Sequence, residues 1–164
     1  MGIDGTFGMA FAKSQMAADL ELPLQGTVFV SVRNKDKRNI LYIVKRLVDL
    51  GFDIVATEGT ANALIRNDIE VTRIRKVSEG RPNVVDLIKN GQIHLIINTP
   101  TSGRTPRQDE VAIRSTATAF NIPIVTTVSG AAATVNAIEA LRRKRLEVRS
   151  LQEYHGWCKA QKQG

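Results

Sequence analysis

The chain has 164 residues, and its hydrophobic fraction of 43% and charged fraction of 24% are typical of a soluble globular domain. Its formal net charge of +7 favours an anionic ligand or partner. Only 5% of the residues are aromatic, which argues against a single-strand nucleic-acid binder. The lone Cys158 excludes an internal disulfide or a cysteine zinc site, and neither a secretory signal nor a membrane-length apolar run is present. We therefore expect a cytoplasmic protein with no metal, no nucleic-acid partner and no membrane partner.

The first 25 residues differ in pattern from the rest of the chain. Residues 6–18 predict a helix with Phe7, Ala10, Phe11 and Ser14 along one face, and residues 20–25 predict a linker that Pro23 interrupts. Such a tethered segment either docks on the following domain or belongs with a neighbouring one, and we expect the latter. The predicted organisation is a preceding tail and linker at 1–25, one domain at 26–155 and a disordered tail at 156–164.

From residue 27 onward, β-branched runs alternate with helical repeats. Predicted strands cover 27–32, 53–56, 71–74, 93–97 and 122–126, and predicted helices cover 37–50, 61–67, 83–90, 108–120 and 131–143. Residues after 147 are polar and predict only a loose segment. Strands that alternate with helices indicate an α/β fold, in which three layers form as helices cover both faces of a parallel sheet.

The turn Thr57-Glu-Gly-Thr60 lies between a predicted strand and a predicted helix. Gly59 permits a tight bend, the threonine hydroxyls can donate hydrogen bonds, and the next helix offers free N–H groups and the positive end of its dipole. This arrangement suits a phosphate. Thr60 is equally explained as an N-cap, and both explanations stay open.

Ligands of open parallel sheets bind beyond the carboxyl ends of the strands, and polar residues follow every predicted strand here. We call the loops at these strand ends the rim. No histidine lies on the rim, and Glu58 and Glu79 are single carboxylates there. The sequence contains neither a catalytic-triad pattern nor a P-loop pattern. We therefore expect anion binding without catalysis. The rim residues are Arg33, Asn34, Lys35, Lys37, Thr57, Thr60, Arg75, Lys76, Arg81, Asn98, Thr101, Ser102, Arg104, Thr126, Thr127 and Ser129.

Several segments resemble one known family. They are Ser31-Val-Arg33 with Asp36-Lys37, the segments 56–60 and 76–82, Ile96-Ile-Asn-Thr99 with Ser102-Gly-Arg104, and Thr126-Thr127. Together they resemble the C-terminal regulatory domain of the carbamoyl phosphate synthetase large subunit, over about residues 25–155. Residues 1–4 and 6–15 are similar to the end of the second synthetase half of that subunit.

The resemblance implies a methylglyoxal-synthase-like fold, with a five-stranded parallel sheet in the order 3-2-1-4-5. It also implies an allosteric role without catalysis or cofactor in this chain. Bacterial members bind UMP as inhibitor and IMP as activator, with ornithine at the domain boundary, and some animal relatives bind N-acetylglutamate. The implied parent is an ATP-dependent, glutamine-hydrolysing ligase of pyrimidine and arginine biosynthesis, which uses ATP, Mg²⁺ and K⁺. Its implied partners are the synthetase domains, a glutaminase small subunit and further copies of itself.

The resemblance also assigns roles by position. Lys37 and the turn 57–60 would hold the phosphate, Lys76, Asn98 and Thr101 the ribose and base, and Thr126 would contact ornithine, although Ile124 stands where some members carry tyrosine. Methylglyoxal synthase is the enzymatic alternative, but its two aspartate positions correspond to Arg81 and about Thr101, so lyase chemistry is not expected. The full expected effector set is Lys37, Thr57, Gly59, Thr60, Lys76, Asn98, Thr101, Ser102 and Thr127.

Overall fold

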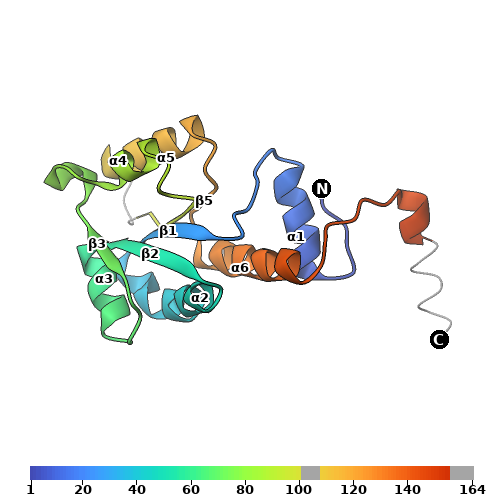
Figure 1. Cartoon of the computed structure of the whole chain (residues 1–164), viewed down its shortest axis with the longest axis horizontal. Coiled ribbons are helices and arrows are strands. Elements are labelled where there is room, and N and C mark those ends of the chain that lie inside the picture. The colour runs from blue at the N-terminus through green and yellow to red at the C-terminus, as the bar shows by residue number, and fades with distance from the viewer. Residues whose placement is uncertain (101–107, 156–164) are drawn as a thin grey trace.

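The computed structural model describes residues 1–100 and 108–155, and its sheet confirms the predicted fold (Figure 1). All strand pairs are parallel and their order is β3-β2-β1-β4-β5. The order places β1 at the centre, between β2 and β4. The strands are β1 (Gly26–Ser31), β2 (Phe52–Thr57), β3 (Thr72–Ile74), β4 (Leu95–Asn98) and β5 (Ile124–Val125).

Helices cover both faces of the sheet. The position of a residue along its strand determines toward which of the two faces its side chain points. Val28 and Val30 of β1 pack in one apolar cluster, whereas Phe29 packs in a second, because successive strand residues point to opposite faces. The first cluster lies under α2 (Lys37–Asp49), α3 (Glu58–Ile65) and α6 (Val128–Arg143), and the second lies under α4 (Val84–Lys89) and α5 (Gln108–Ala119). Short 3₁₀ turns, η1 (Asn34–Asp36) and η2 (Val77–Glu79), follow β1 and β3.

The helix α6 begins at Val128 rather than at residue 131, where the sequence pattern placed its start. Thr127 is its N-cap, and the Thr127 Oγ1 accepts a hydrogen bond of 3.0 Å from the Gly130 N–H. The segment 127–130, which precedes the predicted helix, is therefore the N-cap and first turn of α6.

The first helix, α1 (Phe7–Met16), docks on α6 instead of standing apart from the domain (Figure 1). Its buried residues are Gly8, Met9 and Ala12, whereas Phe7 of the predicted apolar face is 63% exposed. A Cβ on Gly8 would lie only 2.5 Å from the Asn136 carbonyl oxygen, so the absent side chain permits this close approach. The correspondence of residues 1–25 to the end of a synthetase half stays a prediction.

The chain after α6 is also more ordered than the expected loose segment. Residues 151–155 form a helical turn, and Ser150 begins it with hydrogen bonds from its N–H and hydroxyl to the Glu153 carboxylate. The predicted disordered tail at 156–164 lies outside the described residues. Within the described ranges, no helix combines the length and the apolar character that crossing a membrane requires.

Candidate functional site

A cavity of about 290 Å³ lies at the carboxyl ends of β1, β2 and β4, where Ser31, Thr57 and Asn98 end their strands. This is the predicted rim, and the cavity gathers six of the nine expected effector residues, Lys37, Thr57, Gly59, Thr60, Lys76 and Asn98. The described residues that line it are Phe29, Ser31, Val32, Arg33, Asn34, Lys37, Thr57, Gly59, Thr60, Lys76, Val77, Val84, Asn98, Thr99, Asp109, Glu110 and Ile113.

One end of the cavity is built for an anion. The Lys37 ammonium lies 3.2 Å from the point where a side chain on Gly59 would begin, so it stands over the start of α3. Thr57 occupies the N-cap position but gives α3 no capping hydrogen bond, because its hydroxyl pairs with the Ser31 hydroxyl at 3.2 Å. A lysine charge and a helix start without a side-chain cap thus face the same space, as phosphate binding requires.

Thr60 is not the N-cap of this helix, because α3 already begins at Glu58. Its side chain is buried, and its Oγ1 accepts a hydrogen bond of 3.2 Å from the Val32 N–H. Thr60 thereby fixes the start of α3 against the end of β1 and holds the two walls of the anion end in register.

Asn98 supplies an amide to the cavity wall. The residue is 7% exposed, and no hydrogen bond to its side chain occurs within residues 1–100 and 108–155. No fully buried polar side-chain atom in those ranges lacks a partner, so the Asn98 amide keeps its access to the cavity. An amide both donates and accepts, which suits the edge of a base or another planar polar group.

Lys76 lies at the mouth of the cavity and already has an anionic partner. Its Nζ lies 3.0 Å from Glu79 Oε1, and its N–H donates to Glu79 Oε2 at 3.1 Å. The Lys76 side chain is 50% exposed, so this pair is weak and a ligand anion can compete with it.

The cavity holds two carboxylates that the sequence analysis missed. Asp109 and Glu110 line it from the first turn of α5, which corrects the expectation of a rim without a pair of carboxylates. The Ser78 hydroxyl donates to Asp109 Oδ2 at 2.8 Å and so links η2 to α5. The missed signal is an acidic first turn on the helix that follows the polar loop after β4.

A network under the cavity joins the loop after β1 to the end of β4. Arg33 Nε donates to Asp36 Oδ2 at 2.7 Å, and the Arg33 N–H donates to Thr99 Oγ1 at 3.1 Å. Burial alone would raise the pKa of Asp36, but hydrogen bonds from Arg33 and Thr99 and the nearby charges of Arg33 and Lys35 hold it below the ordinary value.

Replacing Asp36 with Asn should lower the free energy of unfolding by roughly 1–2 kcal/mol at pH 7, because the buried charge-assisted hydrogen bonds are lost. The folded-state pKa of Asp36 is depressed, so its stabilisation exists above the ordinary value of 3.8 and is lost as the pH falls through the folded-state value. Urea unfolding at pH 7 and at pH 3 should therefore show a difference from wild type that shrinks with acid. The exposed Asp49→Asn is the control, and an unchanged difference at pH 3 would contradict this account.

Among the described residues that were expected at the site or rim, those that do not line the cavity are Lys35, Arg75, Arg81, Thr126, Thr127 and Ser129. Thr127 caps α6, and Thr126 lies between β5 and that cap. Thr101 and Ser102 lie outside the described residues. Within the described ranges, no group of three or more His, Cys, Asp or Glu side chains could hold a metal ion.

The MGS-like domain family matches residues 39–126. The chain is 51% identical over 155 residues to the C-terminal section of a carbamoyl phosphate synthase large chain from Methanopyrus kandleri, covering 94% of this chain and 29% of that relative. It is 55% identical over 161 residues to the large chain from Mycobacterium tuberculosis, covering 94% of this chain. The chain spans only 14% of that relative's length.

Solved structures support the fold alone. A methylglyoxal synthase from Elizabethkingia anophelis aligns with a TM-score of 0.57 at 16% identity, over 70% of this chain and 79% of that one. The structure of ForH aligns with a TM-score of 0.50 at 18% identity, over 72% of this chain and 80% of that one.

Proposed function

The chain belongs to the MGS-like domain family, and from this premise we propose that it is an effector-binding regulatory domain whose ligand is a nucleoside monophosphate, UMP or IMP. The observation that carries the proposal is the pairing of Lys37 over the start of α3 with the amide of Asn98, which has no hydrogen-bond partner among residues 1–100 and 108–155, in one cavity. The first suits a phosphate, and the second suits a base.

The dimensions and charges of the cavity support a small anion with a polar body. Its volume of about 290 Å³ is near the lower end for small-molecule sites. The cationic end holds Lys37 and Arg33, whereas Asp109 and Glu110 stand at α5, so the cavity is suited to a ligand with an anionic group at one end and hydrogen-bond donors at the other.

The relatives suggest the setting in which such a domain works. We propose that the chain regulates a cytoplasmic ATP-dependent carbamoyl phosphate synthase of pyrimidine and arginine biosynthesis, since it is similar to the large chain of that enzyme. Synthetase domains of the same subunit, a glutaminase small subunit and further copies of the chain would be its partners. ATP, Mg²⁺ and K⁺ would bind in those other parts, and ornithine would contact Thr126 at the domain boundary. An effector changes activity there only by its difference in affinity for two states of the enzyme.

A lyase of the methylglyoxal synthase type is the second candidate, because Asp109 and Glu110 bring carboxylates to the cavity. Arg81 stands at one of the positions expected to carry an aspartate and instead pairs with Asp86 at 3.3 Å. We propose that the chain itself is not catalytic. Formation of methylglyoxal by the purified chain, abolished by Asp109→Asn, would overturn this.

Calorimetric titration of the purified chain with UMP, IMP, ornithine and N-acetylglutamate tests the proposal. We expect one molecule of UMP or IMP per chain, with the two nucleotides competing for one site. If N-acetylglutamate alone binds, the chain is still a regulatory domain, but its effector is an acidic amino-acid derivative and the proposed nucleotide is wrong. No heat from any of the four would overturn effector binding by the chain on its own.

A further inference from the structure

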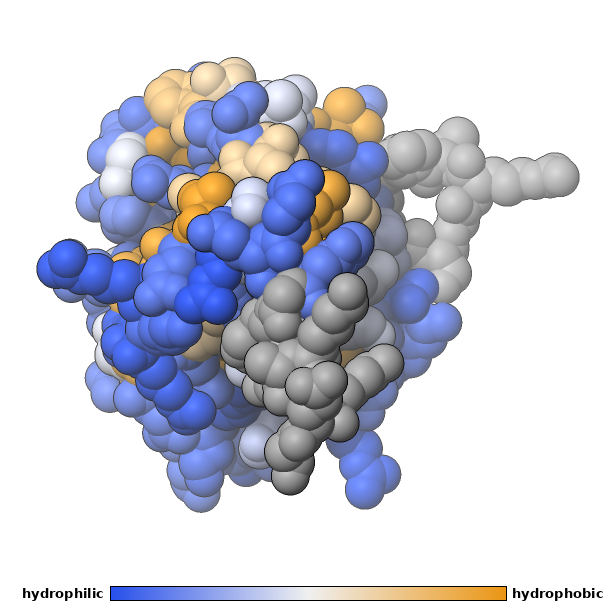
Figure 2. Space-filling model, turned by 90° about the vertical axis from the view of Figure 1, so that its right-hand side faces the viewer, coloured by the Kyte–Doolittle hydropathy of each residue, from blue (hydrophilic) through white to orange (hydrophobic). Residues whose placement is uncertain are grey.

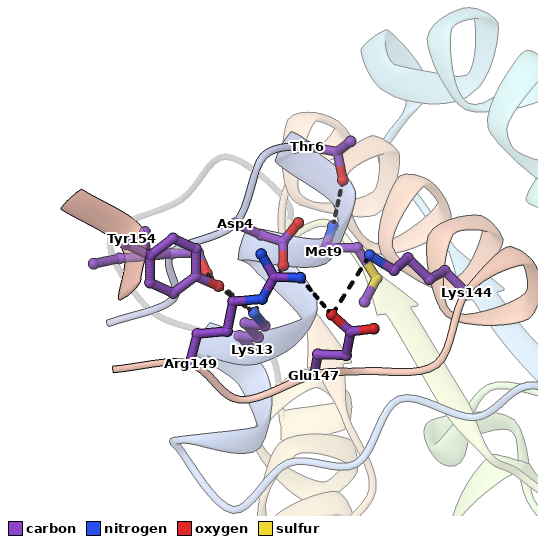
Figure 3. A network of polar contacts seen from close by, with 9 residues as sticks. Asp4, Thr6, Met9, Lys13, Lys144, Glu147, Arg149 and Tyr154 are labelled. Carbon is purple, nitrogen blue, oxygen red and sulfur yellow. Dashed lines mark hydrogen bonds and ion pairs between the residues drawn. The ribbon is translucent and has the colours of Figure 1, made fainter. Parts of the chain in front are cut away.

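A nearly buried lysine joins the first residues of the chain to its last described residues. The Lys13 side chain on α1 is 12% exposed, and its ammonium donates to Asp4 Oδ2 at 2.7 Å, to the Tyr154 hydroxyl at 2.6 Å and to the Ile3 carbonyl at 3.2 Å (Figure 3). Three segments that are separate in sequence therefore meet at a single charge. A charge with so little solvent is stable only while these partners stay in place.

Tyr154 completes the arrangement. Its hydroxyl accepts from Lys13 (Figure 3) and donates to the Ile3 carbonyl at 2.7 Å, so it is used both as acceptor and as donor. The Lys13 ammonium also lies 5.3 Å from the centre of the Tyr154 ring, within range of a cation–π contact. Although burial alone would lower the pKa of Lys13, the hydrogen bonds that its ammonium donates to Asp4 and Tyr154 raise it.

The segment between α6 and Tyr154 is held by ion pairs of its own. Glu147 lies 2.8 Å from Arg149 Nη2 and 3.7 Å from Lys144 Nζ (Figure 3). The hydrogen bond from Arg149 and the charges of Lys144 and Arg149 lower the pKa of Glu147. These pairs are exposed and contribute little stability, so the fixed point of the segment is its far end at Tyr154.

Apolar side chains of the segment and of the first helix region share a cavity. Ile3, Met16, Leu146 and Leu151 line a cavity together with Lys13 and Tyr154. The face of the molecule seen in Figure 2 is mostly hydrophilic, with apolar residues in separate patches. Leu146, Leu151 and Tyr154 of the segment thus share one cavity with Ile3 and Met16, which remain 38% and 47% exposed.

We propose that residues 144–155 form a strap that fastens residues 1–6 to α1, with the Tyr154 hydroxyl bound to Lys13 and Ile3 as its fastening. When the strap opens, residues 1–6 and the start of α1 lose their fixed position while the sheet stays folded. The strap is separate from the cavity at the strand ends, and its test needs no ligand.

Hydrogen–deuterium exchange of the whole chain tests the strap, with Tyr154→Phe as the variant. The change removes one hydroxyl and keeps the ring, and we expect amides of residues 4–12 to exchange roughly tenfold faster, as the loss of a hydrogen bond to a charged group predicts. Amides of β1 and β4 should not change. Tyr42→Phe is the matched control, because Tyr42 is 70% exposed on α2. Exchange equal to that of the control would overturn the proposal.

Lys13→Met provides a second and independent arm. If Tyr154 acts through Lys13, adding Tyr154→Phe to Lys13→Met should accelerate exchange of residues 4–12 much less than Tyr154→Phe does in the wild-type chain. Fully additive effects of the two changes would contradict a shared fastening. Loss of β1 and β4 protection in either single variant would show a general stability effect instead of a strap.

Discussion

The variant Lys37→Met is expected to bind UMP roughly 10- to 100-fold more weakly than the wild-type chain, which is the loss that removing one charge-assisted hydrogen bond to a phosphate predicts. The Lys37 ammonium lies beside Gly59 at the start of α3, where no side-chain cap takes its place. Methionine keeps most of the side-chain length and removes only the charge. Calorimetry measures the affinity, and thermal unfolding should show an unchanged fold, because no ion pair of Lys37 exists within the described residues.

Lys45→Met is the matched control for this experiment. Lys45 lies on the same helix, α2, but is exposed and does not line the cavity. Both variants lower the net charge equally, so a general effect of charge on an anionic ligand would appear in both. Equal weakening by the two variants would contradict a phosphate contact at Lys37 and would point to long-range attraction alone.

The sheet could be predicted from the sequence because each strand is recognisable from the pattern of a few consecutive residues. Val28, Phe29 and Val30 form one β-branched and aromatic run, and the alternation of strands with helices leaves a parallel sheet as the simplest arrangement. The same logic placed Lys37, Thr57 and Asn98 at one rim, and the structure brings them into one cavity. Their role in effector binding stays a prediction.

The acidic wall of the cavity could not be predicted in this way. Asp109 and Glu110 do not directly follow a strand, since a long polar loop separates them from β4. Their position relative to the cavity depends on the path of that loop, and neither hydrophobic periodicity nor the position of the strand ends predicts a loop path. Residues at a helix start are brought to a rim by tertiary packing, which a reading limited to strand ends overlooks.

The buried face of α1 differs from the predicted apolar face for a different physical reason. Apolar periodicity gives weight to large side chains, so Phe7 and Phe11 defined the expected face. The buried residues are Gly8, Met9 and Ala12, with Phe11 partly buried against the core, and the small Gly8 lets the two helix backbones approach closely. Close approach at Gly8 and apolar packing by Met9 and Phe11 together define the face of α1 that meets the domain.

This explanation predicts that Gly8→Ala destabilises the domain by about 1–2 kcal/mol, although alanine is the better helix former. A new Cβ would lie 2.5 Å from the Asn136 carbonyl oxygen and 3.0 Å from the Ala140 Cβ, and the first neighbour is backbone that cannot rotate away. The gain in helix propensity is at most about 1 kcal/mol and is smaller in the first turn of a helix. Overpacking therefore exceeds propensity, and thermal unfolding should show a midpoint lowered by about 2–4 °C for each kcal/mol.

The double variant Gly8→Ala with Ala140→Gly separates the two contacts. It removes the side-chain neighbour and leaves the Asn136 carbonyl, so we expect no recovery of the midpoint relative to Ala140→Gly alone. Full recovery would mean that the Ala140 methyl group, and not the backbone of α6, limits the approach. A Gly8→Ala chain that is more stable than wild type would show that α1 has room on α6, and the small-residue explanation of its docking would then be wrong.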